Sequence, residues 1–387
     1  MYVLIGVLIL MLVVNWTYLV LASRHTSRLS DVLASTAVTE LLDNAWLQNH
    51  ANFGSATQAD DITAANNAVT DGTTGYLKRN NDVAGVALRA SAANPGEVTI
   101  TAARVPDPSQ VAAGGNFNTA PAASEPYNTL RVEIFRDPAG PNPVLLMMRG
   151  FGSPNAAKIT GAATVTLDAR LVGFRPNGVF RAPVAPLALD QLQFFTVRQL
   201  GLLDSNGNGI SEFDFVLQIA ASPLPINCAL VGLNSGAPLD NAGTTIIDQI
   251  RNGEASSDFA AGFLGPVAPV TDAKPYAAGT TISLDADPNG NNGSITATSL
   301  ASAFEDVRAS NYPRRVFPLY SPVYTDPLTI VGFVGARIVE VEAFGGLTLR
   351  LRLEPDFIIH ATAETRPTQS GNPVPENIYI NKTRLTR

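Results

Sequence analysis

The first 22 residues are the longest uninterrupted hydrophobic stretch of the chain. Residues 1–22 contain no charged side chain, and Asn15 is their one strongly polar residue. At 1.5 Å per helical residue, a segment of this length spans about 30 Å, the thickness of the hydrocarbon core of a bilayer. Because backbone polar groups in lipid must be satisfied within the segment, the pattern predicts a membrane-spanning α-helix.

The hydrophobic periodicity continues beyond Arg24 and Arg28, and no Gly or Pro lies between Val7 and Gly54. We therefore predict one helix from about Tyr2 to about Gln48, with its first half in lipid and its second half packed on a folded domain. The residues of the packed stripe recur at spacings of three and four: Leu29, Val32, Leu33, Thr36, Ala37, Leu41, Leu42, Ala45 and Trp46.

Two other interpretations of the N-terminus remain open, a cleaved signal peptide and a buried core helix. A signal peptide has a basic start, a shorter apolar core and a small-x-small cleavage site followed by a loop. Here there is no basic start, the apolar core is long, and the helical pattern continues past it. A core helix rarely has 22 consecutive uncharged residues. A membrane anchor is therefore the favoured interpretation.

The orientation of the anchor follows from two opposing signals. Arg24 and Arg28 follow the apolar segment and, by the positive-inside rule, favour a cytoplasmic C-terminal side. Charged residues, however, make up only 15% of the chain, and Asn, Thr, Ser, Ala, Gly and Pro are abundant, as in exported β-rich proteins. We give the composition more weight and predict a single-pass membrane protein with an extracytoplasmic C-terminal domain.

Alternating and continuous apolar runs dominate the rest of the chain. Residues 98–105, 130–135, 144–151 and 158–174 read as strands, the last as one long strand with its odd-numbered residues on one face. Short helices are expected at 62–71, 244–253 and 299–310 and long β segments near the C-terminus. The predicted fold class is α+β, with a long N-terminal helical stalk and a mostly antiparallel β-rich domain. Residues 1–48 form the anchor and stalk, 49–180 a first β-rich subdomain, and 181–387 a second α+β subdomain.

Composition and motifs argue against several classes of function. The net charge of −7 offers no basic surface for nucleic acid, and the single cysteine, Cys228, excludes an internal disulfide. The three histidines, His25, His50 and His360, are scattered, and neither a G-x-S-x-G elbow nor a phosphate-binding G-x-x-x-x-G-K-[ST] loop is present. The sequence therefore predicts a protein that is not an enzyme.

The best candidate for ligand chemistry is the segment that starts at Asp204. Asp204, Asn206 and Asn208 occupy positions one, three and five of a calcium-binding pattern, with Gly209 at position six. Position twelve is Phe215 in place of the usual Glu, and Asp214 comes one place early. We treat Asp204, Asn206, Asn208 and Asp214 as a weak calcium site, with a tight Asn-Gly turn as the alternative. Residues 285–292 are similarly rich in oxygen ligands.

Several segments together resemble one protein family. They are the uncharged helix, SRHTSRLSDVLASTAVTELL (23–42), LRVEIF (130–135), VLLMMRGF (144–151), ITGAATVTLDARLVGFRP (159–176), PLY (318–320) and TIVGFVGARI (329–338). In this combination the chain is similar to TadE/TadG-like proteins of the tight-adherence (Flp-type) pilus machinery. The chain departs from that family in several respects. The family's Ala-rich run AADAAALA is only SDVLASTAVTELL here, and the chain has no basic n-region and no Gly-Glu prepilin-processing signature. The D-x-S-x-S motif of some relatives is also absent.

The resemblance implies a membrane-anchored, non-enzymatic pilus-assembly or minor-pseudopilin-like envelope protein. Its expected partners are the bilayer and other pilus or secretion-machinery subunits, which the N-terminal helix would contact. The alternatives are an anchored extracytoplasmic binding or adhesion module, assisted by calcium, and an anchored hydrolase.

Overall fold

The structure is a computed structural model in which two compact units can be described separately. The first unit comprises residues 1–167 and 383–387, and the second comprises residues 168–382. The residues that the structure describes are 2–42, 44–48, 54–83, 90–94, 96–108, 117–139, 143–146, 156–200, 203–218, 227–232, 242–258, 277–281, 295–321, 328–344, 348–365, 377 and 379–386.

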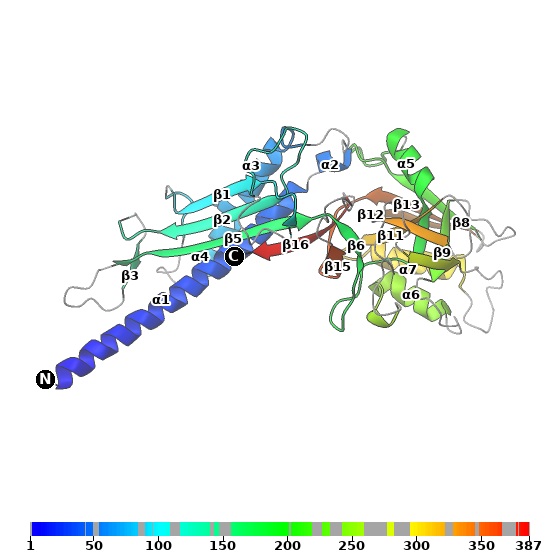
Figure 1. The fold of residues 1–387 in the computed structure, drawn as a ribbon. Coiled ribbons are helices and arrows are strands. Elements are labelled where there is room, and N and C mark those ends of the chain that lie inside the picture. Colours follow the sequence, from blue (N-terminus) through cyan, green and yellow to red (C-terminus); the bar gives the residue numbers. More distant parts are fainter. Residues whose placement is uncertain are drawn as a thin grey trace. The chain divides into compact units, whose positions relative to one another are not determined.

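The first unit begins with α1 (Tyr2–Ala37), a 36-residue helix whose N-terminal half projects beyond the sheet (Figure 1). The prediction of one helix to Gln48 is too long. After Ala37 the chain forms a 3₁₀ turn (Val38–Leu41), bends at Leu42 and resumes as α2 (Asn44–Gln48). Leu42 has φ −98° and ψ 72°, outside the helical region. The β-branched residues Thr36, Val38 and Thr39 have low helix propensity at this point, and no Gly or Pro marks the end.

Two further helices and an antiparallel sheet complete the first unit. The helices are α3 (Ala59–Thr70), which confirms the helix predicted at 62–71, and α4 (Tyr76–Val83), which the sequence pattern did not predict. The sheet has the strand order β1-β2-β5-β16-β14, and β16 enters the first unit at Thr383. The first residues of β16, Ile380 and Asn381, belong to the second unit and pair in parallel with β14 (Ile358–Ile359). The other strands of the sheet and β16 itself are β1 (Val98–Ala103), β2 (Thr129–Arg136), β5 (Ile159–Asp168) and β16 (Ile380–Thr386), and a separate pair is formed by β3 (Val144–Leu145) and β4 (Ala156–Ala157).

One face of this sheet carries the core of the first unit. Leu130, Val132 and Ile134 of β2 are buried and alternate with more exposed residues, as the period-two pattern predicts. In β5 the buried series is Ile159, Gly161, Ala163, Val165 and Leu167, which confirms the predicted face. Register pairs Val132 with Ala163 and Ile134 with Gly161, so the two strands present one continuous apolar surface.

The second unit is built around a mixed sheet with the strand order β10-β9-β7-β11-β12-β13-β8. β7 and β11 pair in parallel, and the other neighbouring pairs are antiparallel. The strands of this unit are β6 (Leu171–Phe174), β7 (Leu187–Asp190), β8 (Phe213–Gln218), β9 (Cys228–Gly232), β10 (Ala277–Thr281), β11 (Arg314–Tyr320), β12 (Leu328–Phe344), β13 (Thr348–Pro355), β14 (Ile358–Ile359) and β15 (Ala363–Thr365).

Helices α5 (Gln191–Leu200), α6 (Ala242–Asn252) and α7 (Ala297–Arg308) belong to the second unit. α7 packs on β12 and β13 and also contacts α6. The helix predicted at 299–310 begins slightly earlier, at Ala297. Thr296 is the N-cap, and its hydroxyl accepts a hydrogen bond from the amide of Ser299. The hydroxyl of Ser299 in turn accepts a hydrogen bond from the amide of Thr296.

The structure also revises the predicted long strand at 158–174. The strand is divided into β5 and β6, which lie in different sheets. Asp168 and Arg170 form a buried ion pair at the break, with 2.9 Å between Arg170 Nε and Asp168 Oδ1. β6 pairs with β15, about 190 residues later in the chain, and this long-range pairing places residues 168–180 in the second unit.

Taken by class, the chain has a long apolar N-terminal helix and a mostly strand-rich remainder with some helix, which is compatible with the predicted α+β class.

Candidate functional site

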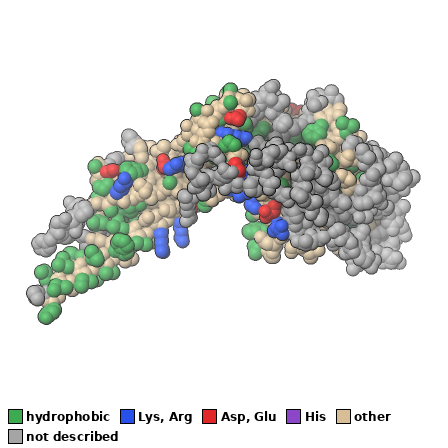
Figure 2. Space-filling view, viewed as in Figure 1, with side chains coloured by type: hydrophobic (Ala, Val, Ile, Leu, Met, Phe, Trp, Pro, Cys, Tyr) green, Lys and Arg blue, Asp and Glu red, His purple; other side chains and the backbone are tan. Residues whose placement is uncertain are grey.

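The N-terminal half of α1 exposes large apolar side chains on all sides. The most exposed of these side chains include Tyr2, Val3, Leu4, Leu12 and Trp16. Leu12, for example, is 72% exposed. Figure 2 shows hydrophobic side chains along this end of the helix. Within the described part of the chain, this helix is the one segment that is long and apolar enough to span a membrane. A fully exposed apolar helix is stable only when lipid or other apolar helices surround it.

The environment of α1 changes abruptly at Ala22, which is the first fully buried residue of the helix. From there to Ala37 one stripe of the helix is buried. Val32 was predicted in this stripe but is 52% exposed. The buried residues are Ala22, Thr26, Leu29, Ser30, Leu33, Ala34 and Ala37. Most of these side chains are small, which lets the helix approach the sheet closely.

The helix and the sheet approach each other closely at Gly161 of β5. A Cβ atom built on Gly161 would lie 2.7 Å from the carbonyl oxygen of Thr26 and 2.8 Å from its carbonyl carbon. Glycine is therefore required at this position because the helix backbone occupies the space of a side chain. The hydroxyl of Thr26 donates a hydrogen bond to the carbonyl of Ala22, at 2.8 Å, within its own helix.

One end of the sheet, at β3 and the start of β5, contacts the apolar segment of α1 directly; this end is called the lower end. Ala22 of α1 packs with Val144 of β3 and Ile159 of β5, and the half-buried Tyr18 and Leu19 pack against this cluster. Tyr18 and Leu19 belong to the 22-residue uncharged segment. The folded first unit therefore starts where the predicted membrane span ends, with no linker between them.

A buried ion pair lies near the same end. The Arg136 guanidinium and the Glu97 carboxylate are both almost completely buried, with 4.0 Å between Arg136 Nε and Glu97 Oε1. Burial lowers the pKa of Arg136, and the Glu97 charge opposes that shift. The pKa of His25 on α1 is also lowered, first by burial and second by the charge of Arg136. His25 thus belongs to a polar cluster of the first unit, which sequence patterns could not reveal.

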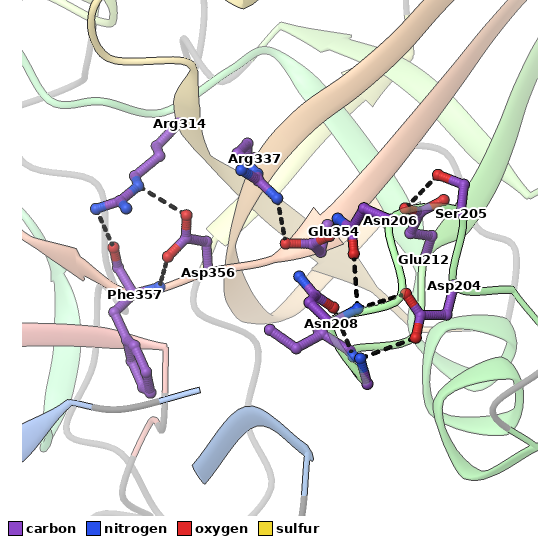
Figure 3. A network of polar contacts seen from close by, with 12 residues as sticks. Asp204, Ser205, Asn206, Asn208, Glu212, Arg314, Arg337, Glu354, Asp356 and Phe357 are labelled. Atoms are coloured by element: carbon purple, nitrogen blue, oxygen red, sulfur yellow. Dashed lines mark hydrogen bonds and ion pairs between the residues drawn. The ribbon is translucent and has the colours of Figure 1, made fainter. Parts of the chain in front are cut away.

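In the second unit the structure gathers three of the four predicted calcium ligands in one loop (Figure 3). Asp204 accepts hydrogen bonds from the amides of Asn208 (3.1 Å) and Gly209 (2.8 Å). Asn206 Oδ1 accepts from the amide of Asn208, and Asn208 Oδ1 accepts from the amide of Ile210. Gly207 and Gly209 have φ values of 70° and 79°, which only glycine adopts readily. The oxygens of this loop thus receive hydrogen bonds from its own backbone.

Asp214, the fourth predicted ligand, lies elsewhere. Both of its oxygens face the guanidinium of Arg352, with Arg352 Nε 2.9 Å from Oδ1 and Nη2 3.3 Å from Oδ2. Cross-strand pairing of β8 with β13 places Asp214 opposite Arg352, so strand register gives this carboxylate a guanidinium partner. Among the residues that the structure describes, no group of three or more His, Cys, Asp or Glu side chains is arranged to hold a metal ion.

A charged cluster that sequence patterns missed surrounds the Asp204 loop. Asn206 donates its side-chain amide to Glu354 at 2.6 Å, and Arg337 pairs with the other oxygen of Glu354 at 2.6 Å. Ser205 donates to Glu212, a fully buried carboxylate, at 2.7 Å. These contacts, visible in Figure 3, tie the loop to β12 and β13, which lie more than 100 residues later in the chain.

Arg352 is the centre of that cluster and also borders a cavity. Besides Asp214, its Nη1 lies 2.9 Å from Glu340 Oε2 and its Nε lies 3.8 Å from Glu212 Oε2. A cavity of about 490 Å³ opens beside α7 and the bulge in β12. The cavity is lined by Ser205, Glu305, Arg308, Val339, Glu340, Val341 and Arg352. Its charged side chains already pair with one another, as in Glu305 with Arg308.

The remaining predicted residues have structural environments. Cys228 is a free, buried thiol at the start of β9, and burial raises its pKa. His360 Nδ1 lies 2.8 Å from Thr362 Oγ1, and burial lowers the pKa of the imidazole. His50 and the oxygen-rich segment 285–292 lie outside the described residues.

Comparison of the chain with family models, with curated proteins and with solved structures finds no match.

Proposed function

We propose that this chain is a single-pass, non-enzymatic envelope protein that takes part in pilus assembly as a minor-pseudopilin-like subunit, with its strand-rich part outside the cytoplasm. One observation carries the proposal: the same uninterrupted helix is apolar and exposed in its first half and buried against an antiparallel sheet in its second half. The sequence resemblance to TadE/TadG-like proteins of tight-adherence pili supports the same assignment.

Physical chemistry limits what can cover the exposed half of α1. Burial of apolar surface contributes about 25 cal/mol per Å², so a helix with a dozen exposed large apolar side chains is strongly driven out of water. Lipid provides one cover, and the apolar helices of neighbouring subunits provide another. The rigid connection at Ala22 supports an assembly role, because a bundle of such helices would display the folded units at a fixed distance from its axis.

The experiment that tests the proposal is photo-cross-linking in cells. A photoreactive amino acid at Leu12, which is 72% exposed, is expected to capture the N-terminal helices of other envelope subunits. The same probe at Leu33, which is fully buried, is the matched control and should capture none of them. Adducts with lipid alone, together with normal surface pili in a deletion strain, would refute the assembly role. The proposal also expects neighbouring genes for a secretion ATPase and a prepilin peptidase.

A second candidate is an anchored binding module that takes up calcium at the Asp204 loop. What supports it is the convergence of Asp204, Asn206 and Asn208 within one turn. The test is a thermal-unfolding titration with about 1 mM calcium, the range of weak extracellular sites. The candidate expects a rise in Tm that Asp204→Ala abolishes and that the exposed-site control Asp306→Ala leaves intact. No rise in the wild-type chain would eliminate it.

A further inference from the structure

The first unit is joined to the proposed membrane span without a spacer, and this geometry sets the height of its lower end. The uncharged segment ends at Ala22, and Ala22 packs directly with Val144 and Ile159. Tyr18 and Leu19, one turn deeper, contact the same cluster. If residues 2–22 fill the hydrocarbon core, the ends of β3 and β5 lie at the boundary between acyl chains and headgroups.

Among the described residues, two exposed cations follow the apolar segment of α1. At 1.5 Å per residue, Arg24 lies about 3 Å and Arg28 about 9 Å beyond Ala22, and the headgroup layer on each side of a bilayer is about 5–7 Å thick. Arg24 and Arg28 are both exposed, and neither guanidinium has an ion-pair partner within the described part of the chain. Figure 2 shows Lys and Arg side chains beyond the apolar end of the helix.

A third cation, Lys158, lies on the face of the sheet that points away from α1. Lys158 is exposed and directly precedes β5, next to Ile159 of the cluster at Ala22. Its ammonium group lies 4.8 Å from the centre of the Phe135 ring, which holds it on the outer face of the sheet.

The acidic groups at this end are less available than the cations. Glu97 is buried and paired with Arg136. Asp137 is half-buried and accepts a hydrogen bond from the amide of Ala139 in its own turn. Leu145, at the end of β3, is 47% exposed and adds an apolar contact at the same height.

We propose that Arg24, Arg28, Lys158 and Leu145 form a docking surface for the headgroups of anionic phospholipids, which seats the first unit on the bilayer. The inference rests on the proposed membrane anchoring and adds a partner of defined chemistry to it. Cationic side chains with long aliphatic stems fit this role, because the stem remains near the acyl chains while the charge reaches the phosphate.

The test uses the full chain reconstituted in vesicles of phosphatidylcholine with about 30% phosphatidylglycerol. Spin-labelled phosphatidylglycerol is expected to associate with the wild-type protein about three-fold more than spin-labelled phosphatidylcholine. The triple variant Arg24→Gln, Arg28→Gln, Lys158→Gln should reduce this ratio to about one. High salt should have the same effect on the wild-type chain, because exposed charges are screened.

A second readout locates the docking surface. In a Cys228→Ala background, a fluorophore on Leu145→Cys should be quenched by lipids that carry a spin label on the headgroup. A fluorophore on Ser124→Cys is the matched control. Ser124 is exposed and precedes the opposite end of β2, about 23 Å or more from the bilayer by strand length, so it should remain unquenched.

The possible failures are distinguishable. Carbonate extraction of the wild-type chain from these vesicles would overturn both the anchoring and the headgroup inference. Stable insertion without preference for phosphatidylglycerol, or an unquenched fluorophore at Leu145→Cys, would overturn the headgroup inference alone. A ratio of about three retained by the triple variant would show that these three cations do not form the site.

Discussion

Gly161→Ala is the most informative single substitution, because it separates a backbone contact from ordinary side-chain packing. The added Cβ would lie 2.7 Å from the carbonyl oxygen and 2.8 Å from the carbonyl carbon of Thr26, whereas ordinary contacts begin at 3.4 Å. To bring this contact to an ordinary distance, α1 must therefore move by about 0.7 Å away from β5. A gap of that size forfeits a quarter to a half of the dispersion attraction of the contacts it separates.

The expected cost is about 3 kcal/mol, at the upper end for overpacking, because a backbone cannot turn aside as a side chain can. For a unit of this size, the Tm is expected to fall by about 6–12 °C. The assay is thermal unfolding of the full chain in detergent micelles, followed by circular dichroism. Ala162→Ser is the matched control, since Ala162 is exposed on the other face of the same strand, and it should change the Tm by no more than about 2 °C.

A second variant tests the reasoning directly. Thr26→Ala removes the methyl group that lies 2.9 Å from the position of the added Cβ but leaves the carbonyl oxygen and carbon of residue 26 in place. It should therefore fail to rescue Gly161→Ala. A Tm for Gly161→Ala within about 2 °C of wild type, or full rescue by Thr26→Ala, would refute a backbone-limited contact.

Three further predictions concern charged groups. Burial, aided by the neighbouring Asp258 carboxylate, raises the pKa of Glu254 well above its ordinary 4.5, so the folded state binds the proton more tightly than the unfolded state. Stability should consequently fall as the pH rises from about 4.5 toward that raised pKa, and Glu254→Gln should flatten this dependence in urea titrations at several pH values. Arg170→Met leaves the buried Asp168 without its guanidinium and should cost about 3–5 kcal/mol in the same assay, whereas a cost below about 1 kcal/mol would contradict the ion pair's role. The hydroxyl of Thr73 and the amides of Thr73 and Thr74 lower the pKa of Asp71 to about 2, so a carboxyl NMR titration should show it ionised at pH 3, and a midpoint near 3.8 would refute these hydrogen bonds.

Local pattern predicted the elements whose side chains face a single environment. The alternation from Ile159 to Leu167 gave the buried face of β5, and the uncharged run to Ala22 gave the exposed half of α1. In β5 burial alternates with the period of the strand, and in the first half of α1 the apolar run is uninterrupted, so in both cases the signal is contained within about ten to twenty residues.

Local pattern was insufficient where distant segments compete. The helix ends at Ala37 although the apolar spacing continues to Trp46, and Asp214 pairs with Arg352 instead of closing the Asp204 loop. Strand register between residues that are more than 100 positions apart directs Asp214, and no local motif encodes that register.

The sequence by itself determined that the chain starts with an apolar helix long enough to span a bilayer and continues as a strand-rich protein, because transfer of side chains from water depends on their composition and period. Tertiary structure alone decided that this helix reaches the sheet at Gly161 without a spacer, where the chain divides into units, and which charges meet around Arg352. Those features depend on contacts between segments far apart in the chain, whose geometry is set only when strands pair and cores close.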